Sequence, residues 1–149
     1  MDINFKLENY VKKLGKRLGI DFAPKRAHDT DAGADLRTPH DFWVPAHDSV
    51  LIDLGVSVEL PPNTCGELWS KSGLNCNACI TTTGLIDEGF SGTIKVRVYN
   101  HGNNAYHFMA GDKVTQLVVK DVHYPTYVEA DTLLSGERGN AGFGSTGKR

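Results

Sequence analysis

The sequence predicts an all-β, jelly-roll-like β-barrel, preceded by a short helix and followed by a glycine-rich tail. Two observations predict this class. After Pro24 the chain consists of short β-prone segments separated by Gly, Pro, Asn and Asp, with almost no helical pattern. The final residues, 138–149, are rich in glycine and carry no packing pattern, so we expect a mobile tail. A length of 149 residues predicts one domain, 1–149.

The first segment, 1–20, is expected to be a helical extension of that domain. Apolar residues recur over 4–18 at spacings of four, three and four, as on one face of a helix: Leu7, Val11, Leu14 and Leu18. Basic residues surround the rest of the helix: Lys12, Lys13, Lys16 and Arg17. We expect a docked surface helix, and a basic arm for a nucleic acid or a partner stays open as the alternative.

The strands are expected in the middle of the chain. In order, the β-prone segments are 49–60, 66–70, 80–86, 93–100 and 113–122. Segment 93–100 alternates, so that three apolar side chains point one way: Ile94, Val96 and Val98. Its polar partners point the other way: Lys95, Arg97 and Tyr99.

Composition limits the functional class. A net charge of −2 gives no indication of nucleic-acid binding, and no apolar run approaches the roughly 20 residues of a membrane span. The first residues lack the apolar core of a secretory signal. The three cysteines are an odd number, which favours a reduced protein in the cytoplasm. Cys76 and Cys79 form a single C-x-x-C without a second ligand pair, so we expect buried or half-buried thiols, with metal binding and redox roles as minor alternatives.

The tail "GFGSTGKR" (142–149) nearly matches a phosphate-binding P-loop. That motif requires Ser or Thr where Arg149 stands, a strand before it and a helix after it. We therefore interpret the match as accidental.

Five segments carry the functional signal: "AGADL" (32–36), "SKSGL" (70–74), "GLIDEGFSG" (84–92), "GDKVTQL" (111–117) and "RGNAGFGSTG" (138–147). In this order, on a small β-rich chain, they resemble the five motifs of the trimeric dUTPase family. The resemblance covers the chain from about residue 24 to its end. It implies a homotrimer with three shared active sites and Mg²⁺-dependent hydrolysis of dUTP to dUMP and pyrophosphate. That reaction limits uracil in DNA and supplies dUMP for thymidylate synthesis.

Asp87 is the candidate catalytic residue. It lies in a turn between Gly84 and Gly89, where a carboxylate can orient and deprotonate a water. An Asp beside Gly commonly stabilises the turn instead, but the resemblance assigns it as the base. Phe90 occupies the position of the family's usual Tyr, which implies a ring beneath the deoxyribose that leaves no room for a 2′-hydroxyl.

The resemblance places the uracil base in the hairpin around 81–95, against the backbone of Gly84, Leu85 and Ile86, with a backbone contribution from Lys95. The "TTT" at 81–83 departs from the family's usual approach to this turn.

The phosphates are expected at the second and fourth motifs. Ser72 and Gly73 offer a hydroxyl and backbone amides, and Gln116 matches a phosphate-side Gln of the family. Lys71 replaces the commoner Arg and lacks its bidentate fork. The magnesium ion is expected to be held by the phosphates, with Asp35 either in its outer shell or in a structural role.

The fifth motif resembles a lid that closes over the nucleotide. Its members are expected to pair with a terminal phosphate, stack on the base and wrap the γ-phosphate: Arg138, Phe143, Gly144, Ser145 and Thr146.

Two other functions are alternatives on the same fold. The homologous dCTP deaminases have a similar "G-F-x-G" turn but need a glutamate where this chain has Arg97, so deamination is disfavoured. A non-catalytic nucleotide-sensing or partner-binding protein on the same fold is the second alternative, and the intact Asp87 argues against it.

Overall fold

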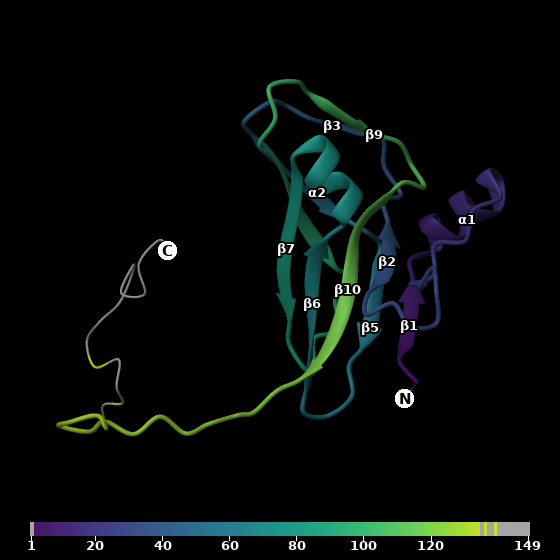
Figure 1. Cartoon of the computed structure of the whole chain (residues 1–149). Helices are drawn as coiled ribbons and strands as arrows, with labels where there is room; N and C mark the ends of the chain where they lie inside the picture. Colours follow the sequence, from purple (N-terminus) through teal and green to yellow (C-terminus); the bar gives the residue numbers. More distant parts are fainter. Residues whose placement is uncertain (1, 135, 137–138, 140–149) are drawn as a thin grey trace.

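A computed structural model describes residues 2–134, 136 and 139. Its centre is a curled six-stranded sheet in the order β2-β10-β6-β7-β8-β4, with all neighbours antiparallel. These strands span Ala34–Arg37 (β2), Ser49–Asp53 (β4), Thr64–Ser70 (β6), Ile80–Ile86 (β7), Lys95–Asn100 (β8) and Lys113–Asp121 (β10). The all-β, jelly-roll-like prediction is confirmed (Figure 1).

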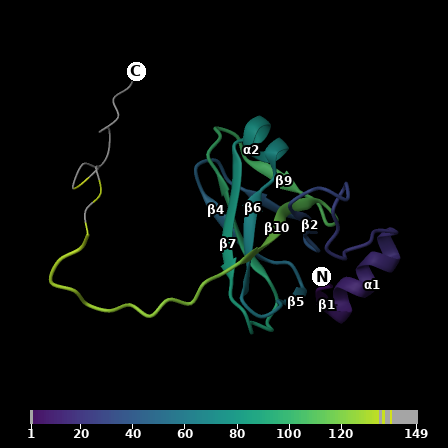
Figure 2. The same ribbon diagram turned by 60° about the horizontal axis from the view of Figure 1, so that its bottom comes forward.

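Two small sheets complete the barrel. One pairs β1 (Asn4–Leu7) with β5 (Val56–Glu59), and the other pairs β3 (Phe42–Val44) with β9 (Tyr106–Phe108). Helix α1 (Asn9–Leu18) lies on the outside beside β1, and helix α2 (Ser72–Ala78) caps one end of the large sheet (Figures 1 and 2).

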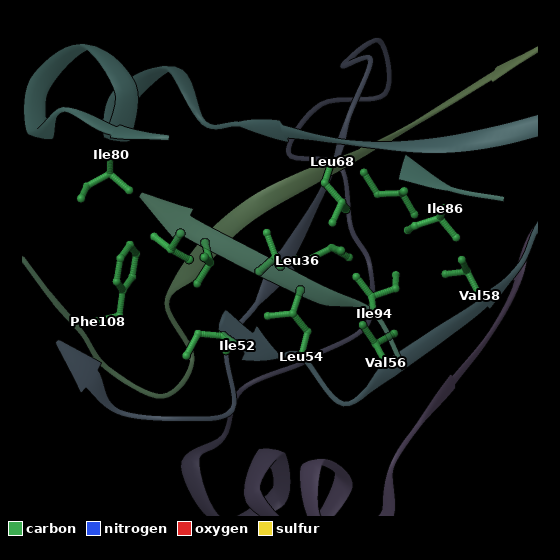
Figure 3. Close-up of a cluster of buried hydrophobic side chains, with 14 of the residues drawn as sticks. Leu36, Ile52, Leu54, Val56, Val58, Leu68, Ile80, Ile86, Ile94 and Phe108 are labelled. Atoms are coloured by element: carbon green, nitrogen blue, oxygen red, sulfur yellow. The ribbon is translucent and has the colours of Figure 1, made fainter. Parts of the chain in front are cut away.

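The core fills the inside of the curled sheet. Apolar side chains from the strands and the turns beside them point toward one another there, among them Leu36, Leu54, Leu68, Ile94 and Phe108 (Figure 3). The alternation expected for 93–100 is confirmed, because Ile94, Val96 and Val98 are buried while Lys95 and Arg97 are exposed. Burial of these β-branched and aliphatic side chains is the main stabilising contribution to such a fold.

The prediction of one helix over 4–18 is wrong for its first residues. Asn4–Leu7 form β1 because their backbone pairs with β5, with Phe5 opposite Val58. The helix begins only after Glu8 and ends at Gly19, which adopts φ 67°. Val11 is its one fully buried side chain. The helix therefore contacts the barrel through fewer apolar side chains than the sequence pattern indicated.

The expectation of almost no helix after residue 20 is wrong for α2. No side chain caps this helix at Lys71, so the usual start signal is missing. Leu74 and Ala78 lie one turn apart and pack, half-buried, against the core, which explains why the segment coils. The segment 49–60 is β as expected but breaks at Leu54–Gly55 into β4 and β5.

All three cysteines are free thiols. Cys65 is buried as expected, whereas Cys76 and Cys79 are exposed, because they lie on the outer side and at the end of α2. Of the helices that the structure describes, none is long and apolar enough to cross a bilayer.

After β10 the chain leaves the barrel. Residues 122–134 extend away from the body as an arm in both views (Figures 1 and 2). Apolar side chains on this arm are strongly exposed, including Tyr127 (91%), Val128 (83%) and Leu133 (87%). Beyond its first residues, this arm gains little burial from its own barrel.

Candidate active site

Asp35 is the centre of a charged cluster at one end of the large sheet. Its side chain is 9% exposed and accepts hydrogen bonds from two ammonium groups, those of Lys71 and Lys113. The Lys113 Nζ–Asp35 Oδ2 distance is 2.7 Å. Burial raises the pKa of the Asp35 carboxyl, but the hydrogen bonds and charges of Lys113 and Lys71 outweigh burial, so its pKa lies below its ordinary value.

The cluster borders a cavity of about 520 Å³. Side chains from β2, β6, α2 and β10 line it, including Asp35, Trp69, Lys71, Ser72 and Gln116. The structure therefore brings together Lys71, Ser72 and Gln116, which the second and fourth motifs assigned to phosphate. Gly73, assigned with them, lines a neighbouring cavity instead. We use the name phosphate-side cluster for Gly33, Asp35, Lys71, Ser72, Lys113 and Gln116.

Gln116 is fixed within this cluster. Its Nε2 donates to the carbonyl oxygen of Ser70 over 3.1 Å. A Cβ added to Gly33 would lie 2.6 Å from Gln116 Oε1, so a side chain at position 33 would require the Gln116 amide to move. The glycine of the first motif thus makes room for the glutamine of the fourth.

Trp69 forms a second polar group beside the cluster. Its Nε1 donates to Glu67 Oε2 over 2.7 Å, and Lys120 Nζ contacts the same oxygen at 2.7 Å while lying 5.5 Å from the Trp69 ring centroid. The bonds from Lys120 and Trp69 lower the pKa of the Glu67 carboxyl. The indole is still 52% exposed and lines the cavity.

Asp87 lies at the other end of the sheet, directly after β7. Its carbonyl oxygen accepts a hydrogen bond from the Phe90 amide over 3.2 Å, which closes a turn. Asp87 is exposed, and the Phe90 ring is 49% exposed. The turn borders a cavity of about 600 Å³ that is also lined by β1 and β5. An exposed carboxylate and an exposed aromatic ring therefore lie in the same turn.

The predicted base-binding stretch lies between two strand pairings. β7 pairs with β8 only as far as Thr83↔Arg97, whereas its pairing with β6 continues to Ile86↔Gly66. The two strands separate beyond Thr83. One edge of Gly84–Ile86 is thereby released from β8, as expected for a backbone that reads a ligand edge.

The phosphate-side cluster and Asp87 are far apart within one chain. Ser70 Oγ is hydrogen-bonded to the backbone of Thr82, and Asp87 lies five positions further along the chain, just past the end of β7. At about 3.3 Å per residue, the separation is roughly 16 Å. A carboxylate, an attacking water, a phosphorus and a phosphate-bound hydroxyl span at most about 10 Å in line.

A model of the dUTPase family matches residues 22–147. The chain belongs to the dUTPase family. It is 40% identical, over 127 residues, to a deoxyuridine 5'-triphosphate nucleotidohydrolase of Gloeothece citriformis, an alignment that covers 83% of this chain and 88% of that protein.

Solved dUTPases share the fold. A mutant dUTPase of Staphylococcus bacteriophage 80alpha, determined with dUpNHpp, has a TM-score of 0.83 at 23% identity and covers 98% of both chains. A mutant dUTPase from phage phi11 of S. aureus, described with a structural Mg(II) ion, has a TM-score of 0.76 at 21% identity and covers 91% of this chain and 100% of that chain.

Within this dUTPase-family chain, some assigned residues lie outside the described part. These are the members of the fifth motif: Arg138, Phe143, Gly144, Ser145 and Thr146. Two described residues of the candidate site, Lys113 and Trp69, were not predicted from the sequence. Lys113 stands inside the quoted fourth motif, and its alternation with Thr115 gave no reason to single it out. Trp69 precedes the second motif on an exposed strand face, and an isolated aromatic carries no signal by itself.

Proposed function

We propose that this chain hydrolyses dUTP to dUMP and pyrophosphate. The observation that carries the proposal is the gathering of Asp35, Lys71, Ser72 and Gln116 around one cavity, in a chain whose dUTPase match spans 22–147. The Lys71 ammonium group, the Ser72 hydroxyl and the Gln116 amide suit a polyphosphate better than a neutral ligand. The nucleotidohydrolase activity named for the Gloeothece relative is of the same kind.

In the proposed reaction Asp87 aims a water at the α-phosphorus and accepts its proton. The new bond joins the water oxygen to the α-phosphorus. The bond that breaks joins the α-phosphorus to the oxygen bridging to the β-phosphorus, and pyrophosphate leaves with that oxygen. The exposed position of Asp87 at the end of β7 supports this role, since its carboxylate makes no side-chain hydrogen bond with the described residues.

Substrate selection is assigned to the turn and the strand before it. The Phe90 ring lies under the deoxyribose and excludes a 2′-hydroxyl, and the released edge of Gly84, Leu85 and Ile86 reads the uracil with the backbone of Lys95. The separation of β7 from β8 beyond Thr83 supports this placement.

The residues present fit a magnesium ion held by the substrate. Both oxygens of Asp35 already accept from lysines, so this carboxylate suits an outer-shell contact through water better than direct coordination. The described residues include no group of three or more side chains that could hold a metal by themselves. Mg²⁺ is typically bound through substrate phosphates with few protein ligands. When bound, it would offset the charge of the triphosphate.

We further propose that the active protein is a homotrimer with shared sites. At the rise of a β-strand, the phosphate-side cluster and Asp87 are roughly 16 Å apart. This exceeds the span of about 10 Å over which a base, a water and the contacts of one phosphate group lie in line. A complete site then combines Asp87 and Phe90 of one copy with the phosphate-side cluster of another. The arm of residues 122–134, which leaves its own barrel, supports delivery of the fifth motif to a further copy (Figure 1).

The two alternatives have less support. Arg97 is exposed on β8 and donates to Ser49 Oγ over 3.1 Å, so it offers no acid for deamination. A binding protein without catalysis would have no need of an Asp87 carboxylate that makes no side-chain hydrogen bond with the described residues. The free thiols Cys65, Cys76 and Cys79 favour a cytoplasmic location.

The decisive assay measures pyrophosphate release from dUTP, UTP, dTTP and dCTP, each with and without Mg²⁺. We expect rapid release of pyrophosphate only from dUTP and only when Mg²⁺ is present. Release from dCTP with equal efficiency, or none from any nucleotide, would refute the proposed activity.

Shared sites are tested by mixing two inactive variants, Asp87→Asn and Lys71→Ala. After joint refolding, a site is active when it receives native Asp87 from one copy and native Lys71 from another. In an equal, random mixture each condition is met in about half of the sites, so about a quarter of the native activity should return. Mixtures as inactive as the separate variants would contradict shared sites.

A further inference from the structure

Glu88, the neighbour of Asp87, is bonded to two other parts of the molecule. Its Oε2 accepts a hydrogen bond from the backbone amide of Asn63, at 2.8 Å, and another from the hydroxyl of Tyr124, at 2.6 Å. Asn63 lies between β5 and β6, and Tyr124 lies three residues after β10, at the base of the arm. One carboxylate thus connects three segments that are distant in sequence.

The turn that carries Asp87 depends on this carboxylate. Asp87, Glu88, Gly89 and Phe90 form a four-residue turn closed by the Phe90 amide, with Gly89 at φ 82°. A positive φ at the third position is typical of a type II turn and favours glycine there. Glu88 holds the second position, between the proposed base and the proposed sugar-facing ring, so its side chain can set the orientation of both.

Packing does little to hold this turn. All four of its residues are exposed. Within the described part of the chain, the bonds of Glu88 to Asn63 and Tyr124 are the only side-chain hydrogen bonds that the turn makes. The anchor itself is firm, because the Asn63 carbonyl oxygen accepts from the Val122 amide at 2.8 Å.

We propose that Glu88 is a positioning residue for dUTP hydrolysis, which fixes the Asp87–Phe90 turn against Asn63 and the base of the arm. The inference rests on the proposed function, since it assigns a role within the same site. Glu88 acts through Asp87 and does not touch the reacting atoms. Tyr124 is its partner, and it links the start of the arm to the turn that carries the base.

The protonation states suit this arrangement. The bonds from Tyr124 and Asn63 lower the pKa of the Glu88 carboxyl, so it is ionised at neutral pH. The hydrogen bond to Glu88 is the largest cause that raises the pKa of the Tyr124 hydroxyl, and the charge of Asp87 adds to it. The tyrosine therefore stays a donor, and Asp87 lies close enough to affect it.

The test compares Glu88→Ala, Glu88→Gln and Tyr124→Phe, with Tyr127→Phe as the matched control. Tyr127 is 91% exposed on the same arm and its hydroxyl has no partner among the described residues. Steady-state kcat and KM for dUTP, the Kd of a non-hydrolysable dUTP analogue and the thermal unfolding temperature are measured for each.

We expect Glu88→Ala to lower kcat roughly tenfold, because small misplacements of a catalytic group are costly, while the analogue Kd and the unfolding temperature change little. Glu88→Gln keeps an acceptor oxygen and should recover most of kcat. Tyr124→Phe should fall between them, and Tyr127→Phe should match the native protein.

Three outcomes decide the matter. A native kcat in both Glu88→Ala and Tyr124→Phe would overturn the inference. A loss of kcat that accompanies a loss of folding and is not rescued by Glu88→Gln would also overturn it. If Glu88→Ala does not fold, the kcat of Tyr124→Phe alone tests the inference. Failure of the native protein to release pyrophosphate from dUTP would instead refute the proposed function.

Discussion

Lys113 on β10 donates to Asp35 on β2, in a pair of strands where Gln116 lies directly opposite Asp35. Together with Lys71, this contact makes the first-motif aspartate a neutralised group at the wall of the cavity. The two lysines are ordered before any phosphate arrives, which lowers the entropic cost of binding one.

Asp35→Asn should destabilise the fold in a pH-dependent way. The folded pKa of Asp35 lies below the ordinary 3.8, so its stabilisation is complete above that value and is lost as the pH falls through the folded pKa. We expect the variant to lose about 2 kcal/mol at neutral pH, less than a fully buried pair because both lysines reach water. Urea unfolding of both proteins from pH 7 to pH 2 measures the difference, which should shrink in acid. Asp131→Asn, on the exposed arm, should show no difference at any pH.

Asp87→Asn should abolish most catalysis and leave binding intact. The amide keeps the shape of the side chain but cannot accept the proton of the water, so kcat should fall by at least ~10²-fold. The Kd of a non-hydrolysable dUTP analogue should stay near the native value. A variant with near-native kcat would remove Asp87 from the mechanism.

Trp69 should report phosphate binding by fluorescence. It is 52% exposed in the wall of the same cavity as Ser72, whereas Trp43, the second tryptophan, is stacked on His107 on another sheet. In Trp43→Phe, adding a non-hydrolysable dUTP analogue should change the emission. The same addition to Trp69→Phe should have no effect. A signal from Trp43 instead would place the ligand elsewhere.

Asn100→Ala should affect stability and not chemistry. The buried Asn100 amide donates to the carbonyl oxygens of Val44 and Asn104, at 3.0 and 2.8 Å, and its oxygen accepts from the Gly102 amide at 2.9 Å. Loss of the side chain leaves these backbone groups unpaired, at about 2–4 kcal/mol. Chemical denaturation measures this loss, and KM for dUTP at low temperature should stay native.

Truncation after Arg138 should remove activity without unfolding the barrel. The buried apolar side chains of the described residues lie between Val11 and Leu117, and the arm is strongly exposed at Leu133 and Leu134. We expect a steep fall in kcat because Phe143, Ser145 and Thr146 are lost, while the unfolding temperature without ligand changes by little. An active truncated protein would show that the fifth motif is dispensable.

The fold class was predictable because strand periodicity depends only on local burial, as at Ile94, Val96 and Val98. Asn4–Leu7 were misassigned because their strand exists only through pairing with β5, a contact between distant segments. Helix α2 was not predicted because only Leu74 and Ala78 pack against the core, and two side chains are too few to form a recognisable helical pattern.

The site was predictable as a set of motif residues but not as a geometry. The motifs predict which side chains act, since each short segment keeps its own chemistry, and the structure places Asp35, Lys71, Ser72 and Gln116 around one cavity. Register decides the rest: the pairing of β6 with β7 places Ser70 beside Thr82 and carries Asp87 away from Lys71. The second lysine on Asp35 follows from the pairing of β2 with β10, which no local pattern specifies.

The length of β7 has a consequence for how the activity is controlled. Because Asp87 and the phosphate-side cluster occupy opposite ends of this strand, a solitary chain in the proposed assembly carries two halves of different sites and no whole one. Turnover per chain then obeys mass action and falls on dilution below the dissociation constant of the trimer, although no residue has changed. The active fraction therefore depends on the concentration of the chain: when the chain is scarce, a smaller share of it is assembled into active trimers.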